Sequence, residues 1–212
     1  MDKIVYVLLG LTSVTGLAVI LWRAWVLRWD GVVPPSTIAA LEACRTPDDL
    51  VALRARCQER PSPLGRLLLV AADHLDWSKA DTEAAVESAA RREIVRLERG
   101  IVVLEVIVGI APLLGLVGTI LGMMNVFGDL GQTGLNNIND AAKLAQGISL
   151  ILRATLIGLL ISIPSLVAWS YFSKKVEVIA VELETLCAEF IRRQYSGQNA
   201  HRTAAEDPDQ TA

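Results

Sequence analysis

Three stretches without a charged side chain constrain this chain more than any other feature of its sequence. Residues 4–22, 106–128 and 154–173 contain no Asp, Glu, Lys or Arg. Each reaches the roughly 20 apolar residues that an α-helix needs to cross the hydrocarbon core of a membrane. The chain is 52% hydrophobic with a mean hydropathy of +0.43, which is too apolar for an ordinary soluble domain. The sequence therefore predicts an all-α integral membrane protein with three transmembrane helices.

The first stretch has two interpretations, a signal peptide or a retained transmembrane helix. Lys3 precedes the apolar run, as a basic residue does in a signal peptide. The run is longer than a signal-peptide core, however, and ends in the bulky "LWRAW" without a small-x-small cleavage site. We expect a retained span.

Basic residues near the ends of the spans predict their orientation. Arg23 and Arg28 follow the first span, four arginines within 91–99 precede the second, and two lysines at 174–175 follow the third. Only Lys143 is basic in residues 129–143, the expected loop between the second and third spans. Because basic residues gather on the cytoplasmic side, the N-terminus is expected outside and the C-terminus in the cytoplasm.

The spans and the charges together divide the chain into seven segments. The expected segments are residues 1–27 (a short periplasmic N-terminus and the first span), 28–104 (a cytoplasmic helical loop and stalk), 105–128 (the second span), 129–143 (a short periplasmic loop), 144–173 (the third span), 174–195 (a cytoplasmic helix) and 196–212 (a polar, disordered tail).

The cytoplasmic segment carries helix start signals. Thr46-Pro47 and Ser62-Pro63 each offer an N-cap followed by proline at the first helical position, and Ser78 to Asp81 is a capping box. No proline follows until Pro112, inside the second span. The pattern predicts one continuous helix from Ala80 to Phe127.

Both long helices are expected to carry a narrow apolar seam for a neighbouring helix, because apolar residues recur at spacings of three and four. The two seams are Ala90, Ile94, Leu97, Ile101, Leu104 and Val108, and Val176, Ile179, Leu183, Leu186 and Phe190. The three cysteines, Cys44, Cys57 and Cys187, are expected to be small buried hydrophobic residues.

Small residues share one face of the second span. At 100° per residue, Gly115, Gly118, Thr119 and Gly122 point the same way, and Gly118 to Gly122 is a GxxxG spacing. The third span carries a similar stripe: Gly147, Ile151, Ala154, Thr155, Gly158, Ser162 and Ser165. The two stripes predict close helix packing.

Each stripe holds one threonine among residues too small to cover it. The hydroxyl of Thr119 or Thr155 can bond the carbonyl four residues earlier in its own helix, or it can face a cavity. The pattern leaves both alternatives open.

These residues carry a resemblance to a known family. "LERGIVVLEVIVGIAPLLGLVGTILGMMNVF", followed by "LAQGISLILRATLIGLLISIPSLVAWSYF", resembles the two membrane signatures of the MotA/TolQ/ExbB proton-channel family, with the closer match to its TolQ/ExbB branch. The specific pieces are Ala111-Pro112-Leu113-Leu114-Gly115-Leu116 with Gly118-Thr119 and Gly122-Met123, and Ala154-Thr155 with Gly158-Leu159 and Ile163-Pro164. Three spans fit this branch, whereas MotA-like stators have four.

The resemblance implies a subunit of the bacterial inner membrane that forms a ring, thought to be a homopentamer, around a dimer of a single-span partner similar to ExbD or TolR. In such a complex the second and third helices line a pore, the partner supplies an aspartate that carries the proton, and Thr119 and Thr155 stand at the polar lining positions. Proton motive force would then drive work on periplasmic or outer-membrane components, with a TonB-like or TolA-like protein as a further partner. No cofactor is implied.

The sequence departs from the family pattern at the start of the third span. Where many relatives carry a glutamate in "GIxEALxAT", this chain has Leu150, and it adds Arg153. Counting back from Lys174 places Arg153 at the outer interface, about 200° from Thr155. Arg153 is expected to reach lipid head groups or to pair with Asp129 or Asp140 of a neighbour, with a gating charge as the alternative.

The remaining charged residues and the histidines predict no proton relay, metal site or catalytic site. Glu105, at the inner end of the second span, is expected to be an interface residue in preference to a proton relay. His74 and His201 lack metal-spaced companions, so no metal site is predicted. No nucleophile–base pair or phosphate loop occurs, which argues against an enzyme. The alternative to an ion-driven stator is a membrane scaffold, in which the glycines serve packing alone.

Overall fold

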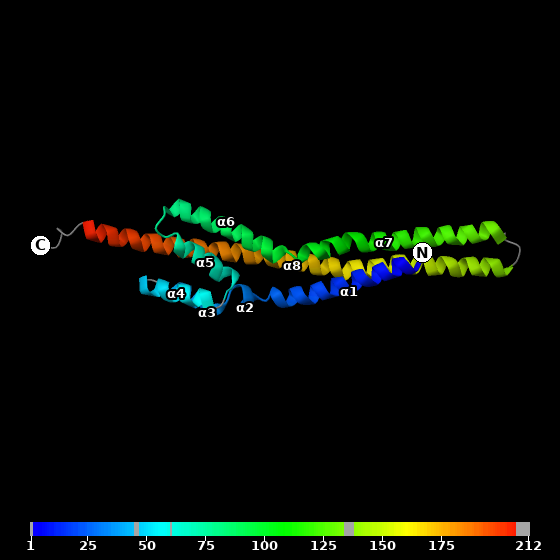
Figure 1. Cartoon of the computed structure of the whole chain (residues 1–212), viewed down its shortest axis with the longest axis horizontal. Coiled ribbons are helices and arrows are strands. Elements are labelled where there is room, and N and C mark those ends of the chain that lie inside the picture. The colour runs from blue at the N-terminus through cyan, green and yellow to red at the C-terminus, as the bar shows by residue number, and fades with distance from the viewer. Residues whose placement is uncertain (1, 45–46, 60, 134–137, 207–212) are drawn as a thin grey trace. The chain divides into compact units, whose positions relative to one another are not determined.

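The computed structural model describes residues 2–44, 47–59, 61–133 and 138–206, and in these ranges it contains helices and no strands. The helices are α1 (Asp2–Val26), α2 (Trp29–Val32), α3 (Pro35–Ala43), α4 (Pro47–Glu59), α5 (Pro63–Asp73), α6 (Lys79–Glu98), α7 (Ile101–Thr133) and α8 (Ile138–Glu206). Figure 1 labels them and colours them from blue at the N-terminus to red at the C-terminus.

The chain forms two compact units, and α8 contributes to both. The membrane unit comprises Met1–Trp25 and Arg99–Ser173, and the second unit comprises Val26–Glu98 and Lys174–Ala212. Three helical segments are long and apolar enough to cross a membrane: Ile4–Val26, Ile101–Gly128 and Ala145–Ser196. They confirm the three predicted spans.

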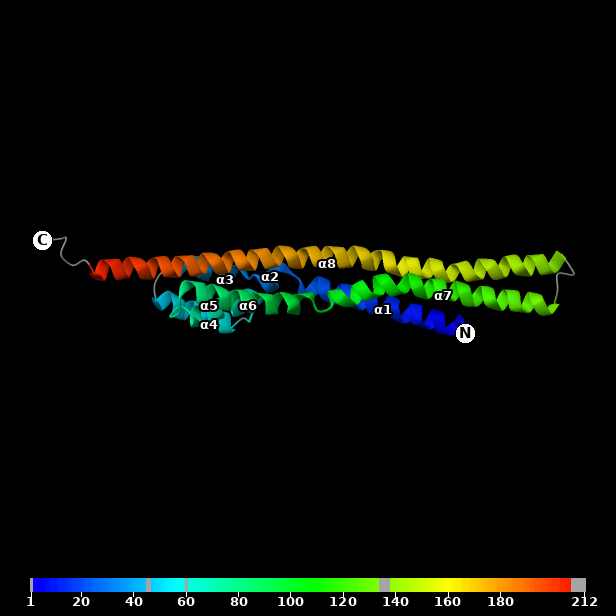
Figure 2. The same cartoon turned by 90° about the horizontal axis from the view of Figure 1, so that it is seen from above.

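In the membrane unit α7 and α8 run side by side, and α1 packs against both (Figures 1 and 2). A Cβ atom added at Gly16 of α1 would lie 3.5 Å from both Ile107 of α7 and Ser165 of α8. Val5 of α1 approaches the Gly118 position of α7. Glycine therefore allows close contact where the three helices meet.

The second unit is a stack of short helices in which each contacts the next, from α3 to α6. α4, α5 and α6 begin where the sequence predicts, and the caps of α5 and α6 are confirmed, while Thr46, the expected cap of α4, lies outside the described residues. Ser62 Oγ accepts a hydrogen bond of 3.0 Å from the Gly65 amide, and Ser78 Oγ accepts one of 3.2 Å from the Asp81 amide. The cap residues therefore satisfy amides that have no partner inside the helix.

The end of α8 is tied to the turn between α5 and α6. The Tyr195 hydroxyl lies 2.8 Å from Thr82 Oγ1 and donates to the Trp77 carbonyl at 2.9 Å. Thr82 in turn donates to the His74 carbonyl at 2.7 Å, and the His74 and Trp77 rings pack edge to face. These contacts bring together residues more than 100 positions apart in the chain.

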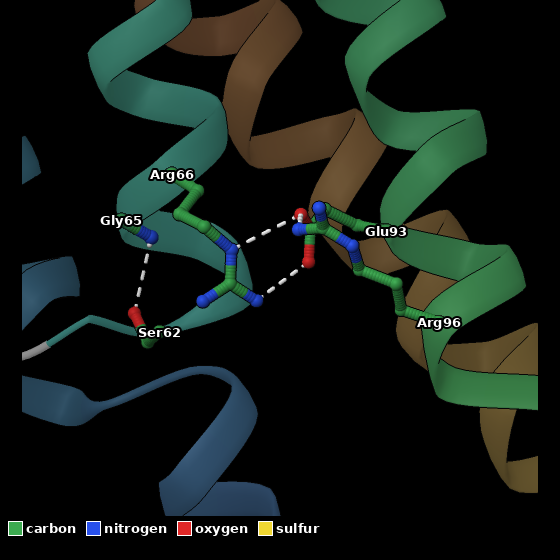
Figure 3. Close-up of polar contacts among 5 residues, drawn as sticks. All are labelled: Ser62, Gly65, Arg66, Glu93 and Arg96. Atoms are coloured by element: carbon green, nitrogen blue, oxygen red, sulfur yellow. Dashed lines mark hydrogen bonds and ion pairs between the residues drawn. The ribbon is translucent and has the colours of Figure 1, made fainter. Parts of the chain in front are cut away.

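An ion cluster around the buried carboxylate of Glu93 joins α5 to α6 (Figure 3). Arg66 of α5 donates two hydrogen bonds, of 3.0 and 2.5 Å, to the two carboxylate oxygens of Glu93 on α6. Arg96 donates a third at 2.7 Å. Burial alone would raise the pKa of Glu93, but the hydrogen bonds and positive charges of Arg66 and Arg96 outweigh it and lower that pKa.

We expect Glu93→Gln to destabilise the protein by about 1.5–3 kcal/mol near neutral pH, because the variant loses charge-assisted hydrogen bonds. The Glu93 carboxyl has a lower pKa in the folded protein than its unfolded value of about 4.3, so it stabilises the fold above that value. This contribution disappears as the pH falls through the folded pKa, and there the wild type and the variant should converge. Thermal unfolding as a function of pH measures the difference.

Glu87→Gln is the matched control for this prediction. Glu87 pairs with Arg91 on the same helix at 2.6 Å, but both side chains are exposed. Such a pair contributes at most about 1 kcal/mol. Equal destabilisation by the two substitutions would contradict the assignment of Glu93 as a buried anchor.

The predicted continuous helix from Ala80 to Phe127 is wrong. α6 ends at Glu98 and α7 begins at Ile101, with a turn at Arg99 and Gly100. Arg23 Nη2 of α1 donates a 2.7 Å hydrogen bond to the Arg99 carbonyl at this turn. This contact joins residues that are far apart in the chain, and a local sequence pattern does not reveal it.

Helices extend into two segments that the sequence predicted to be a loop and a disordered tail. α7 continues to Thr133 and α8 begins at Ile138, so both ends of the expected loop 129–143 are helical, while residues 134–137 lie outside the described residues. α8 also continues past Tyr195 to Glu206, where the sequence indicated a disordered tail. Extending an existing helix costs far less than starting one, so helices run beyond the limits set by polarity.

The seams and the cysteines follow the prediction. Most of the predicted seam is buried, namely Ala90, Leu97, Ile101, Leu104, Val176, Ile179, Leu183 and Phe190. The three cysteines are free and buried. Burial raises the pKa of the Cys44 and Cys57 thiols, which keeps them protonated and unreactive.

Candidate functional site: the α7–α8 helix pair

Glycines bring the α7 and α8 backbones into direct contact. A Cβ atom added at Gly158 would lie 2.5 Å from the Ala111 carbonyl oxygen, and one added at Gly115 would lie 2.9 Å from the Ala154 carbonyl oxygen. Real Cβ atoms essentially never approach other atoms this closely. These two positions of the helix pair therefore accept only glycine.

The other predicted packing glycines meet side chains. A Cβ atom would lie 2.6 Å from Ile151 at Gly122, 2.9 Å from Ala154 at Gly118 and 2.9 Å from Val126 at Gly147. Moving a side chain aside costs less free energy than moving the backbone of a helix. The small-residue faces thus pack against each other within one chain.

Pro112 and Ser162 form a complementary pair across the two helices. Pro112 lies inside α7 and has no amide hydrogen to donate to the Val108 carbonyl four residues earlier. Ser162 Oγ of α8 donates a 3.0 Å hydrogen bond to that same carbonyl. A neighbouring hydroxyl therefore satisfies the acceptor that the proline leaves free, as expected in an apolar environment. Sequence reasoning placed Ser162 on the stripe but gave it no partner.

The two threonines make different hydrogen bonds. Thr119 Oγ1 donates to the Leu116 carbonyl at 2.6 Å, three residues earlier in α7. Thr155 Oγ1 donates across the helix pair to the Gly115 carbonyl at 3.3 Å, which is longer than the usual range of about 2.5–3.0 Å for a hydroxyl donor and makes the bond weak. Both hydroxyls keep oxygen lone pairs that can accept a hydrogen bond.

The remaining predicted site residues lie toward the surface of the chain. Glu105 and Arg153 are exposed, and Arg153 lies among the side chains of Ile148, Leu152 and Leu156 on α8. Pro164 lies inside α8 and lines a groove with Tyr6 and Leu9 of α1. The side chains of Asp129 and Asp140, the expected partners of Arg153, lie outside the described residues.

We expect Arg153→Ala to impair assembly before it affects ion flux, because the exposed guanidinium lies on the opposite side of α8 from the Thr155 stripe. Arg153→Lys is the matched control and should behave as the wild type. Blue-native gels report assembly, and proton flux in proteoliposomes reports the channel activity that the family resemblance implies. An intact oligomer of Arg153→Ala without any proton-driven function would contradict an interface role.

Comparison with known proteins places this helix pair in a family. The model of the MotA/TolQ/ExbB proton channel family matches residues 59–185. The Synechocystis sp. protein named ExbB-like 1 is 32% identical over 149 residues, which cover 70% of this chain and 56% of that protein. The biopolymer transport protein ExbB of Helicobacter pylori is 36% identical over 104 residues, covering 49% of this chain and 68% of the relative.

The chain also matches a relative that is named TolQ. The Tol-Pal system protein TolQ of Pseudomonas aeruginosa is 34% identical over 119 residues, covering 52% of this chain and 49% of that protein. The chain spans about half the length of several of the curated relatives it matches. Since residues 59–185 include both α7 and the membrane part of α8, the chain belongs to the MotA/TolQ/ExbB proton channel family, within its ExbB/TolQ branch.

Proposed function

We propose that this chain is the ring-forming subunit of a proton-driven stator in a bacterial inner membrane. It would act with a single-span partner similar to ExbD or TolR, whose aspartate takes up and releases the proton. The complex would convert proton motive force into work on periplasmic or outer-membrane components, with a TonB-like or TolA-like protein as the further partner. Family membership supports the channel role.

The observation that carries this proposal is the chemistry of the α7–α8 pair. Residues 106–128 and 154–173 contain no carboxylate, and the two threonine hydroxyls lie on the small-residue faces. A proton cannot cross about 30 Å of hydrocarbon without a titratable or hydrated route. A subunit that offers hydroxyls needs a proton carrier from elsewhere.

The geometry of the hydroxyls suits an inserted carboxyl group. Because Thr119 and Thr155 donate their hydrogens to backbone carbonyls, their free lone pairs can accept a hydrogen bond from a protonated carboxylic acid. An ionised carboxylate gains no donor from hydroxyls held in this way. The lining would therefore favour the neutral form of the partner's aspartate, which suits a group that must cross the membrane uncharged.

Proton flux into proteoliposomes tests the proposal. The chain is reconstituted alone and together with a single-span protein similar to ExbD or TolR, and a pH-sensitive dye follows proton entry under a potassium-diffusion potential. We expect the chain alone to be poorly conducting and the complex to conduct. Replacing the partner's membrane aspartate by asparagine should return the flux to that of the chain alone.

The alternative function is a membrane scaffold without ion conduction, favoured by the observation that the glycines and both hydroxyls already have partners within the chain. An assembled complex that conducts no protons in this assay would support the scaffold and overturn the stator. Conduction by the chain alone, equal to that of the complex, would overturn the role assigned to the partner.

A further inference from the structure

Arg23, near the end of the first span, is buried where an arginine ordinarily reaches out to water. Its exposed fraction is 2%, whereas that of the adjacent Trp22 is 54%. Arg28, a few residues later, is exposed as expected for a basic residue at the end of a span. Burying a guanidinium is costly unless its charge and all its donors are satisfied.

The contacts of Arg23 satisfy it only in part. Nη2 donates to the Arg99 carbonyl at 2.7 Å, and the guanidinium carbon lies 5.2 Å from the centre of the Trp22 ring. Nε is buried without a hydrogen-bond partner, and among the described residues no carboxylate pairs with this side chain. Burying this guanidinium therefore costs free energy, and the main favourable contact that offsets the cost is the hydrogen bond to the turn between α6 and α7.

Gly100 alone does not account for that turn. A glycine costs a helix about 1 kcal/mol relative to alanine, which weakens a helix but does not end it. Six glycines lie inside α7 without interrupting it: Gly109, Gly115, Gly118, Gly122, Gly128 and Gly131. The interruption at Gly100 therefore has a further cause.

The space beside Gly100 is filled by Arg23. A Cβ atom at this position would lie 2.7 Å from Arg23 Nε and 3.1 Å from the Trp22 ring. The carbonyl that Arg23 binds lies just past the last residue of α6, where the helix dipole attracts a cation. We propose that Arg23 imposes the interruption between α6 and α7, and that Gly100 serves to admit its guanidinium.

Removing the guanidinium should let α6 and α7 form one continuous helix. In Arg23→Met the α6 and α7 segments are expected to join, and the amides of residues 101–103 should exchange hydrogen for deuterium roughly fivefold more slowly as each gains a backbone hydrogen bond. The measurement is hydrogen exchange of the full chain in phospholipid nanodiscs. Arg28→Met is the matched control, since it removes an exposed arginine at the same end of the span, and it should leave these amides unchanged.

Unchanged exchange in Arg23→Met would overturn the proposal, because the break would then persist without the guanidinium. A second measurement needs no change at Arg23. Gly100→Ala should expel the guanidinium and make Arg23 reactive toward phenylglyoxal, with Arg28 reactive throughout. Gly109→Ala, at a position with open space around it, should leave Arg23 protected. Continued protection of Arg23 in Gly100→Ala would equally overturn the proposal.

Discussion

A single methyl group added at Gly158 is expected to force α7 and α8 apart. The Cβ atom of Gly158→Ala would lie 2.5 Å from the Ala111 carbonyl oxygen and 3.3 Å from Gly115 Cα, and both are backbone atoms that no side-chain rotation can move. Overpacking of this kind costs about 1–3 kcal/mol, and more where backbone must separate. The expected result is a lower unfolding temperature in detergent and loss of the oligomer in native mass spectrometry.

Gly109→Ala is the matched control for this prediction, because a Cβ atom at Gly109 meets nothing within 4 Å. It makes the same chemical change in the partner helix and should be neutral or slightly stabilising, since alanine favours helix. If Gly158→Ala were as stable as Gly109→Ala, the close α7–α8 contact would be wrong.

The GxxxG positions extend the series to larger side chains. Gly118→Leu and Gly122→Leu add bulk against Ala154 and Ile151. We expect the proposed closed homo-oligomer to break down in both variants, because separating α7 from α8 within each chain also changes the surface that each chain would present to its neighbours. Unchanged oligomers in both leucine variants would contradict a role of this face in assembly.

Features that depend on short stretches of sequence were predictable. The three spans follow from charge-free runs alone, and the starts of α5 and α6 follow from Ser62 and Ser78, whose hydroxyls cap amides three residues later. The small-residue faces were equally visible, because a helix places residues three and four apart on one side. Their partner was not, since periodicity identifies a face and not the helix that covers it.

Features that depend on distant residues were missed. The interruption at Gly100 requires Arg23, which bonds a carbonyl 76 positions away. The bond from Ser162 to the Val108 carbonyl joins residues 54 positions apart, although Pro112 gave a signal for it by leaving that carbonyl without its helical donor. A proline inside a predicted span therefore justifies a search for a hydroxyl on the neighbouring span.

The second large effect is expected from the two threonines of the α7–α8 pair. Thr119→Val and Thr155→Val keep the branched shape of the side chain and remove its hydroxyl. The lost hydrogen bonds contribute only about 0.6 kcal/mol each in a membrane, so the complex should remain assembled. By contrast, each single variant loses one acceptor for the partner's carboxylic acid and should have lower transport-coupled activity. The double variant loses both acceptors and should lose most of this activity.

Two control substitutions separate this effect from packing. Thr12 of α1 donates to the carbonyl three residues earlier at 2.9 Å, as Thr119 does in α7, so Thr12→Val removes an equivalent bond from a helix outside the pair. Ser162→Ala removes a hydroxyl that crosses from α8 to an α7 carbonyl, as that of Thr155 does. Proton flux and partner-dependent activity are measured for the two single threonine variants, the double variant and the two controls, beside native mass spectrometry of the complex. Full activity of the double threonine variant with the partner present would show that these hydroxyls serve packing. If Thr12→Val lost as much activity as Thr119→Val, the effect would instead be due to helix stability.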